Sequence, residues 1–213
     1  ATRSGTDSAA HPASVWVGVV RSDHYTKEEE LIEGQYRNET VEDSDGSHTT
    51  YEYLLPEEAA FKSFFYEMFQ QHWGDMVFGP CLEGAVFEIQ LTDPPQLGYL
   101  DGYLTVNLKD WHFHLCLGLH KGSKANSTSD ALAQQRRPSK AAFFRSIGRG
   151  GRFGSWGFRL WNGAQEQMLT IFFPNPYLSE RMKPQKPDWS RLVLWNEMRC
   201  KYLPGAVAWS PEG

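Results

Sequence analysis

The stretch Asp110-Trp-His-Phe-His-Leu-Cys-Leu-Gly-Leu-His120 says more about this fold than any other part of the sequence. In an extended strand, side chains alternate between the two faces, so residues two apart lie on the same face. One face therefore carries His112, His114, Cys116 and His120, and the other carries Phe113, Leu115, Leu117 and Leu119. This alternation predicts a strand over residues 111–119 with one polar and one apolar face.

The preceding residues 99–108 are expected to form the partner strand. Only Lys109 and Asp110 separate the two stretches, and a two-residue connection is typical of a β-hairpin. Paired positions then sum to 219, and the polar pairs are Asn107–His112, Thr105–His114, Tyr103–Cys116 and Asp101–Gly118. The two strands agree on which face is polar, so the hairpin has more support than either pattern alone provides.

The polar face of this hairpin is the main candidate for a metal site, because imidazole and thiol groups are ligands that transition metals prefer. On a strand, the Cα atoms of His112 and His114 lie roughly 6.6 Å apart, so both rings can reach one ion. Cys116 lies about 13 Å from His112, which is too far for both to share an ion without a bend. The site is therefore expected to use His112 with His114, or His114 with Cys116, plus ligands from elsewhere.

Glu83 is the first candidate for the missing ligand. It would lie beside Asn107 if strand 85–91 paired with strand 99–108 so that positions sum to 190, whereas a one-residue slip would bring Glu88. Further ligand candidates are Asp101 and Cys81. Zinc suits this mixed set best, with iron or copper as alternatives. The residues expected to orient the ligands through hydrogen bonds are Tyr103, Thr105, Asn107 and Asp101.

A second interpretation of this face needs no metal. It is a polar strand surface closed by hydrogen bonds, with Cys116 acting as a small buried apolar side chain.

Composition narrows the class of protein. The chain has 213 residues, 40% of them hydrophobic, and a net charge of −5 with a pI near 5.8. This charge argues against a nucleic-acid surface, and no run of about eighteen apolar residues predicts a membrane span. The three cysteines form no CxxC pair, which excludes a zinc ribbon and favours a reducing compartment.

The pattern along the chain predicts an α+β fold. Residues 1–13 are expected to be a disordered tail, and residues 14–213 a single domain with an acidic excursion at about 21–50. The expected helices are 56–74, 138–147 and 187–203, with a helical turn at 131–135, and the expected strands are 15–20, 85–91, the hairpin 99–119 and a second hairpin over 156–173. Hairpins flanked by helices predict an antiparallel sheet with helices packed on one face.

Five arginines between residues 136 and 152 form a second candidate site: Arg136, Arg137, Arg145, Arg149 and Arg152. Together with nearby glycines they are suited to an anionic ligand, a carboxylate-bearing tetrapyrrole or an acidic partner protein. The glycines lack the spacing and the following Lys and Ser or Thr of a phosphate loop. The alternative is a solvated helix face followed by a mobile linker.

Two resemblances add expectations. The string Trp111-His-Phe-His114 resembles the zinc-binding strand of α-type carbonic anhydrases, which implies that a metal-activated water is chemically feasible here. More widely, Phe78-Gly-Pro-Cys81, Leu100-Asp-Gly-Tyr103, Trp111-His-Phe-His-Leu-Cys116, Trp161-Asn-Gly163 and Pro174-Asn-Pro176 resemble an uncharacterised family of cyanobacteria and plastid-bearing eukaryotes over about residues 56–205. That resemblance implies a chloroplast stroma location, with the cytoplasm as the alternative, and it implies no activity.

Three functions follow as expectations. The first is a soluble metal-binding protein that could act as a metalloenzyme through a metal-activated water. The second is a non-catalytic assembly or adaptor protein of a plastid photosynthetic complex, which would hold a protein partner through acidic segment 27–45 and an aromatic surface. The third is a tetrapyrrole-binding protein with a histidine axial ligand and arginines on the propionates.

Overall fold

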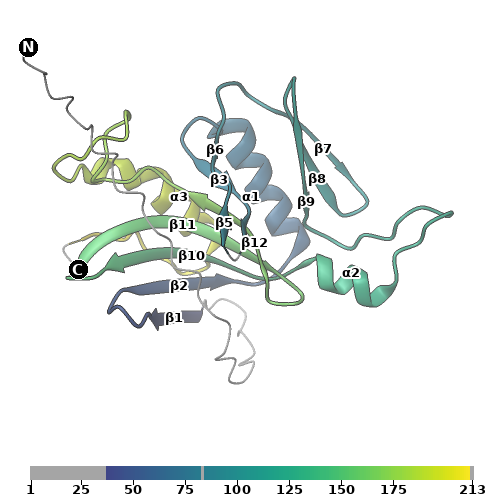
Figure 1. The fold of residues 1–213 in the computed structure, drawn as a ribbon, viewed down its shortest axis with the longest axis horizontal. Helices are drawn as coiled ribbons and strands as arrows, with labels where there is room; N and C mark the ends of the chain where they lie inside the picture. Colours follow the sequence, from purple (N-terminus) through teal and green to yellow (C-terminus); the bar gives the residue numbers. More distant parts are fainter. Residues whose placement is uncertain (1–36, 83, 212–213) are drawn as a thin grey trace, which may run out of the picture.

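The computed structural model describes residues 37–82 and 84–211, and its main element is a seven-stranded antiparallel sheet (Figure 1). In sheet order the strands are β1 (Arg37–Glu42), β2 (His48–Leu54), β10 (Pro138–Gly148), β11 (Arg152–Asn162), β12 (Gln167–Phe172), β3 (Val77–Gly79) and β6 (Ile89–Gln90). The expected tail, the strand at 15–20 and Glu83 lie outside the described residues.

A smaller sheet and three helices complete the described fold. The sheet has the order β7 (Gln96–Leu100), β8 (Tyr103–Asn107) and β9 (His112–Cys116), and β4 (Cys81–Leu82) pairs separately with β5 (Ala85–Val86). The helices are α1 (Glu58–Gln71), α2 (Asp130–Arg136) and α3 (Val193–Tyr202), the last preceded by a 3-10 turn at Trp189–Leu192. The α+β fold with a mostly antiparallel sheet is thus confirmed.

Helix α1 carries the centre of the core. Phe64 lies 4.2 Å from Phe158 of β11 between ring centroids, and Phe69 lies 4.9 Å from Phe78 of β3. The other side of α1 meets the small sheet, where the ammonium of Lys62 lies 4.5 Å from the ring centre of Tyr99. Each fully buried phenylalanine stabilises the fold by about 1.5–3 kcal/mol, so this helix fixes the two sheets against each other.

Helix α3 packs on the same face of the large sheet as α1. Its Trp195 donates a hydrogen bond from Nε1 to the carbonyl of Gly157, and its Arg199 forms a two-pronged ion pair with Glu52 of β2, with Nη2 to Oε1 at 2.7 Å. Both charged side chains are buried. Removing one partner of such a pair costs about 3–5 kcal/mol, because the other charge stays buried without compensation.

The hairpin of β8 and β9 has the predicted register. Tyr103 lies opposite Cys116 and Asn107 opposite His112, so paired positions sum to 219 throughout the ladder. The prediction of one continuous strand over 99–108 was wrong, because Asp101 and Gly102 have φ of 47° and 82° and form a tight turn between β7 and β8. An Asp-Gly pair favours that turn, since both of its central positions need positive φ.

This turn also overturns the predicted pairing of strand 85–91 with strand 99–108. Gln96 of β7 occupies the place beside Asn107, so the second edge of β8 is already filled. Residues 85–91 instead contribute β5, which pairs with β4, and β6, which pairs with β3. Neither register that would have brought Glu83 or Glu88 to the histidines is formed.

Two further expectations were wrong. Residues 138–147 form β10 instead of a helix, because β10 pairs with β2 on one side and β11 on the other, and these long ladders outweigh the local helical preference of its alanines. Part of the expected acidic excursion forms the hairpin of β1 and β2, in which Thr40 faces Thr50. The helices at 58–71 and 193–202, the turn at 130–136 and the hairpin around Asn162-Gly163 are confirmed.

Candidate functional site

The two predicted metal-binding histidines lie together on an open strand face. The ring centroids of His112 and His114 are 4.8 Å apart, and both side chains are exposed. Thr105 of β8 lies opposite His114, with 2.9 Å between its hydroxyl and Nδ1 of the ring. The rings thus project in a common direction, as the sequence predicts, but from a surface instead of from a pocket.

The other predicted ligands are held in other interactions. The thiol of Cys116 is buried and donates to the carbonyl of Gly118, and burial raises the pKa of this thiol. Asp101 accepts hydrogen bonds from the main-chain N–H groups of Lys121 and Gly122 and lies 3.0 Å from Nδ1 of His120. Within residues 37–82 and 84–211, no three His, Cys, Asp or Glu side chains converge as a metal site would require.

The remaining members of the predicted site are placed as follows. Tyr103 lies beside Cys116, and its ring meets that of His120 edge-on at 5.0 Å between centroids. Asn107 lies opposite His112 and is exposed. Glu83 itself lies outside the described residues, and the strand pairing that would have placed it beside Asn107 is not formed.

The five arginines do not form one cluster. Arg136 and Arg137 lie at the end of α2, before β10 begins, whereas Arg149 and Arg152 follow its far end. Eleven strand residues separate these ends by about 33 Å. Arg145, in the middle, has Nη1 3.8 Å from the buried carboxylate of Glu52.

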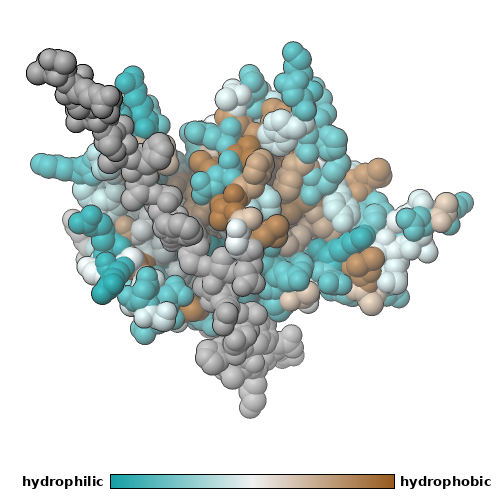
Figure 2. All heavy atoms as spheres, in the orientation of Figure 1, coloured by the Kyte–Doolittle hydropathy of each residue, from teal (hydrophilic) through white to brown (hydrophobic). Residues whose placement is uncertain are grey.

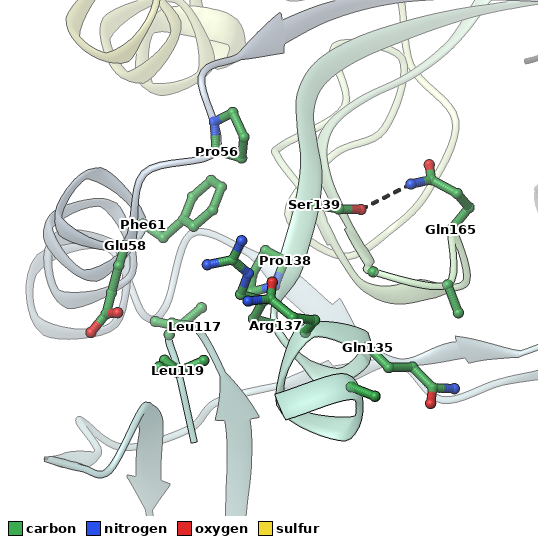
Figure 3. Close-up of a pocket in the computed structure, with 15 residues that line it drawn as sticks. Pro56, Glu58, Phe61, Leu117, Leu119, Gln135, Arg137, Pro138, Ser139 and Gln165 are labelled. Carbon is green, nitrogen blue, oxygen red and sulfur yellow. Dashed lines mark hydrogen bonds between the residues drawn. The ribbon is translucent and has the colours of Figure 1, made fainter. Parts of the chain in front are cut away.

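A cavity of about 520 Å³ lies beside Arg137 (Figure 3). Five segments distant in the sequence form it: residues 56–61 at the start of α1, 117–119 after β9, 131–135 in α2, 137–139 entering β10, and 163–165 in the turn from β11 to β12. Such a volume is within the range of small-molecule sites in proteins. The cavity is therefore a concave functional candidate in the described part of the chain.

The walls of this pocket are mixed in character. Phe61, Leu117 and Pro138 are buried and give it an apolar side. The carboxylate of Glu58 lies at one end, where it accepts a hydrogen bond of 2.7 Å from the hydroxyl of Tyr99. That bond and burial together raise the pKa of the tyrosine, with burial the larger cause.

Arg137 is the cation of the pocket. Its side chain extends from the end of α2 across the opening in Figure 3. None of the described residues forms a hydrogen bond or ion pair with its guanidinium, which keeps five N–H donors available. A planar cation with free donors beside an apolar wall is suited to a carboxylate or phosphate.

Gln165 adds an unsatisfied acceptor on the opposite side. Its Nε2 donates to the hydroxyl of Ser139 at 3.0 Å (Figure 3), while its Oε1 is buried and has no donor among the described residues. The residue also has φ of +64°, a conformation uncommon for side chains other than glycine. A buried acceptor without a partner costs about 1–3 kcal/mol, and solvent does not reach this oxygen in the described structure.

Two glycines allow the walls of the pocket to approach each other closely. A Cβ atom on Gly118 would lie 2.1 Å from the carboxyl group of Glu58, and one on Gly163 would lie 2.1 Å from the main-chain oxygen of Gln134. The N–H of Gly163 also donates to the carbonyl of Gln135, which ties the turn to α2. The sequence marks Arg137 as an anion ligand and Asn162-Gly163 as a turn, but it carries no signal that would bring Glu58 and Gln165 to the same cavity.

An exposed apolar patch lies on the β4–β5 hairpin. Leu82, Val86 and Phe87 are 60%, 52% and 63% exposed, and Figure 2 shows apolar residues gathered over this part of the molecule. Patches of this kind often mark interaction surfaces. No helix in the described ranges is both long and apolar enough to cross a membrane.

Fold and pocket together define an α+β protein with a small-molecule-sized cavity. The chain belongs to a family of unknown function, DUF7676, whose sequence model matches residues 38–204. Among solved structures it is similar to protein AGR_C_4470 from Agrobacterium tumefaciens, with 15% identity and a TM-score of 0.44 over 75% of this chain and 73% of that chain. A search of curated proteins finds no match.

Proposed function

We propose that this protein binds a small organic anion in the pocket between α1 and α2. The observation that carries this proposal is the guanidinium of Arg137, which lines a cavity of about 520 Å³ and has no acidic partner among the described residues. A charge-assisted hydrogen bond from arginine contributes about 1.5–3 kcal/mol. This contribution is large enough to decide whether a small ligand stays bound.

The rest of the pocket narrows the class of ligand. Phe61, Leu117 and Pro138 favour an apolar body, so an inorganic anion would leave most of the cavity unused. The carboxylate of Glu58 is an acceptor in the lining of the pocket, which suits a ligand that also carries an N–H or O–H donor. We therefore infer a carboxylate, or a phosphate ester, with an apolar body and at least one hydrogen-bond donor.

The test is capture of the ligand from a small-molecule extract. The immobilised protein is incubated with the extract, washed and denatured, and the released compounds are identified by mass spectrometry. Arg137→Leu removes the proposed anion contact, and Arg136→Leu is the matched control because this neighbouring arginine does not line the pocket. We expect an anionic compound that is enriched by the wild type and by Arg136→Leu, and about tenfold to hundredfold less by Arg137→Leu.

The outcome against the proposal is equally definite. If no compound is enriched, or if both leucine variants retain the same compound equally, the pocket does not recognise an anion through Arg137. Far-UV circular dichroism of the variants checks that the fold is kept.

The other functions expected from the sequence stay predictions beside the anion-binding proposal. The described residues that line the pocket include no histidine, so the cavity does not support a tetrapyrrole with a histidine axial ligand. The chloroplast location, the cyanobacterial and plastid distribution and the partner role of segment 27–45 are part of the wider proposal, and purification of the native protein from plastid stroma would test them.

A further inference from the structure

Strand β9 is the edge of the small sheet, and its main-chain groups alternate between β8 and the open side. The carbonyl of Trp111 accepts from the N–H of Leu108, and the N–H of Leu117 donates to the carbonyl of Gly102. Odd-numbered residues of β9 therefore bond toward β8. The N–H and C=O groups of His112 and His114 point to the other side, where no described residue bonds with them.

We propose that β9 pairs antiparallel with β9 of a second copy of this chain, and that the four histidines of the two strands bind a transition-metal ion. An exposed edge strand offers a row of unpaired main-chain groups that another strand can complete. The pairing would join two three-stranded sheets into one continuous sheet of six. It would also supply ligands that residues 37–82 and 84–211 of a single chain do not bring to this face.

One register satisfies both the backbone and the side chains. When paired positions sum to 226, His112 lies opposite His114 of the second copy, and His114 lies opposite the second His112. Both residues point their main-chain groups outward, so these are hydrogen-bonded pairs. Side chains opposite each other lie on the same face with Cβ atoms about 4.5–5.5 Å apart, which gathers four imidazoles on one side of the joint sheet.

In this register, the face of the joint sheet opposite the histidines is apolar. Phe113 lies on the twofold axis opposite its own copy, and Trp111 lies opposite Leu115 of the second copy. Trp111 is 38% exposed in the single chain, and Phe113 is only half-buried. Association would remove this apolar area from water, at roughly 25 cal/mol per Å² of surface covered.

The neighbouring registers are less favourable. A sum of 224 would set His112 opposite itself but His114 opposite Asp110. A sum of 228 would set His112 opposite Cys116, whose thiol is buried and donates to the carbonyl of Gly118. Only the register with a sum of 226 places both His112 and His114 opposite a histidine of the other copy and keeps Asp110 and Cys116 out of these pairs.

The number of imidazole ligands in the dimer indicates which metal would bind. Zinc prefers four nitrogen or sulfur ligands, and one chain offers two imidazoles 4.8 Å apart. Thr105 lies 2.9 Å from Nδ1 of His114, which orients that ring and keeps its Nε2 available for the ion. The site is complete in the dimer, whereas the described residues of either copy alone supply only two of its ligands.

The test measures the mass of the untagged protein in solution by sedimentation velocity, with zinc sulfate and with EDTA. We expect a dimer that holds about one zinc per two chains, and at least a tenfold stronger association with zinc than with EDTA. The double variant His112→Asn/His114→Asn should stay monomeric, while His72→Asn, which lies just after α1, should behave as the wild type does. Trp111→Ala should keep both ligands and weaken the dimer.

Three results would overturn the inference. They are a monomer at all zinc concentrations, zinc bound tightly by a monomer, and a dimer that persists unchanged in the double variant or in EDTA. Because none of these measurements depends on the pocket, they leave the anion-binding proposal untouched.

Discussion

The pocket and the histidine face of β9 use similar polar side chains but are assembled in opposite ways. The pocket draws Glu58, Arg137 and Gln165 from three distant segments to the lining of one cavity, where Glu58 and Arg137 stay exposed. The histidine face takes His112 and His114 from one strand and leaves both exposed. A site that comes from one strand is visible in the alternation of the sequence, whereas a site built from five segments is visible only after folding.

The difference also changes what each site can hold. A concave pocket can surround a small organic molecule and remove it from water. An open strand face with two ligands holds a metal weakly, and needs a second surface to complete the coordination. The following predictions test this contrast, beginning with the largest effect.

Cysteine reactivity tests whether Cys116 is separated from the exposed histidines beside it. Cys116 is buried with a raised pKa, whereas Cys200 is exposed. Because only the accessible thiolate reacts, we expect Cys200 to be alkylated on the order of a hundredfold faster or more in the native protein. Mass spectrometry of peptides after brief iodoacetamide treatment measures this, with Cys200→Ser as the control. Equal rates would place Cys116 at the surface and return it to the set of metal ligands.

Two glycine variants test how the pocket is closed. In Gly163→Ala the new Cβ meets the main-chain oxygen of Gln134, so we expect the free energy of unfolding to fall by about 1–3 kcal/mol. In Gly118→Ala it meets the carboxyl end of Glu58, a side chain that can move, so stability should change less while ligand binding weakens. Urea denaturation compares them. A larger stability loss in Gly118→Ala would contradict the described walls.

Thr105→Val tests whether the hydroxyl of Thr105 orients the ring of His114 for metal binding. It removes the hydroxyl beside Nδ1 of His114 and keeps the shape of the side chain. We expect zinc-driven association to weaken on the order of tenfold, as is usual when a partner of a ligating histidine is lost. Thr40→Val is the matched control, because its hydroxyl meets only that of Thr50 on the β1–β2 hairpin. Sedimentation across a zinc titration measures both, and identical behaviour would separate Thr105 from the metal.

Asp101→Asn is expected to have the smallest effect, and a defined pH dependence. The N–H of Lys121 lowers the pKa of Asp101 below 3.8, burial opposes this, and the N–H of Gly122 lowers it further. The folded state therefore gains stability from the charged carboxylate above pH 3.8, and this gain is lost as the pH falls through the lower folded value. The difference in urea midpoint between wild type and variant should be present at pH 7 and vanish toward pH 2. A difference that is the same at both pH values would exclude this linkage.

These contrasts show which parts of the fold were predictable. The register of β8 with β9 followed from alternation and a two-residue connection, both of which are local in sequence. Strand β10 was missed because its pairing with β2 and β11 depends on segments far from it in sequence. The free acceptor of Gln165 could not be foreseen, since its burial arises only when the turn from β11 to β12 packs against α2.

The most direct test of the central claim follows the guanidinium of Arg137 by NMR. Protein labelled with ¹⁵N at arginine is titrated with phenylacetate, a carboxylate with an apolar body, and with toluene, which has the same body without the charge. We predict that phenylacetate shifts the Nε–Hε signal of Arg137 in a saturable way, while the signal of Arg136 stays in place and toluene has no comparable effect. An Arg137 signal that is unchanged at saturating phenylacetate, or that responds to both compounds alike, would contradict an anion-binding pocket.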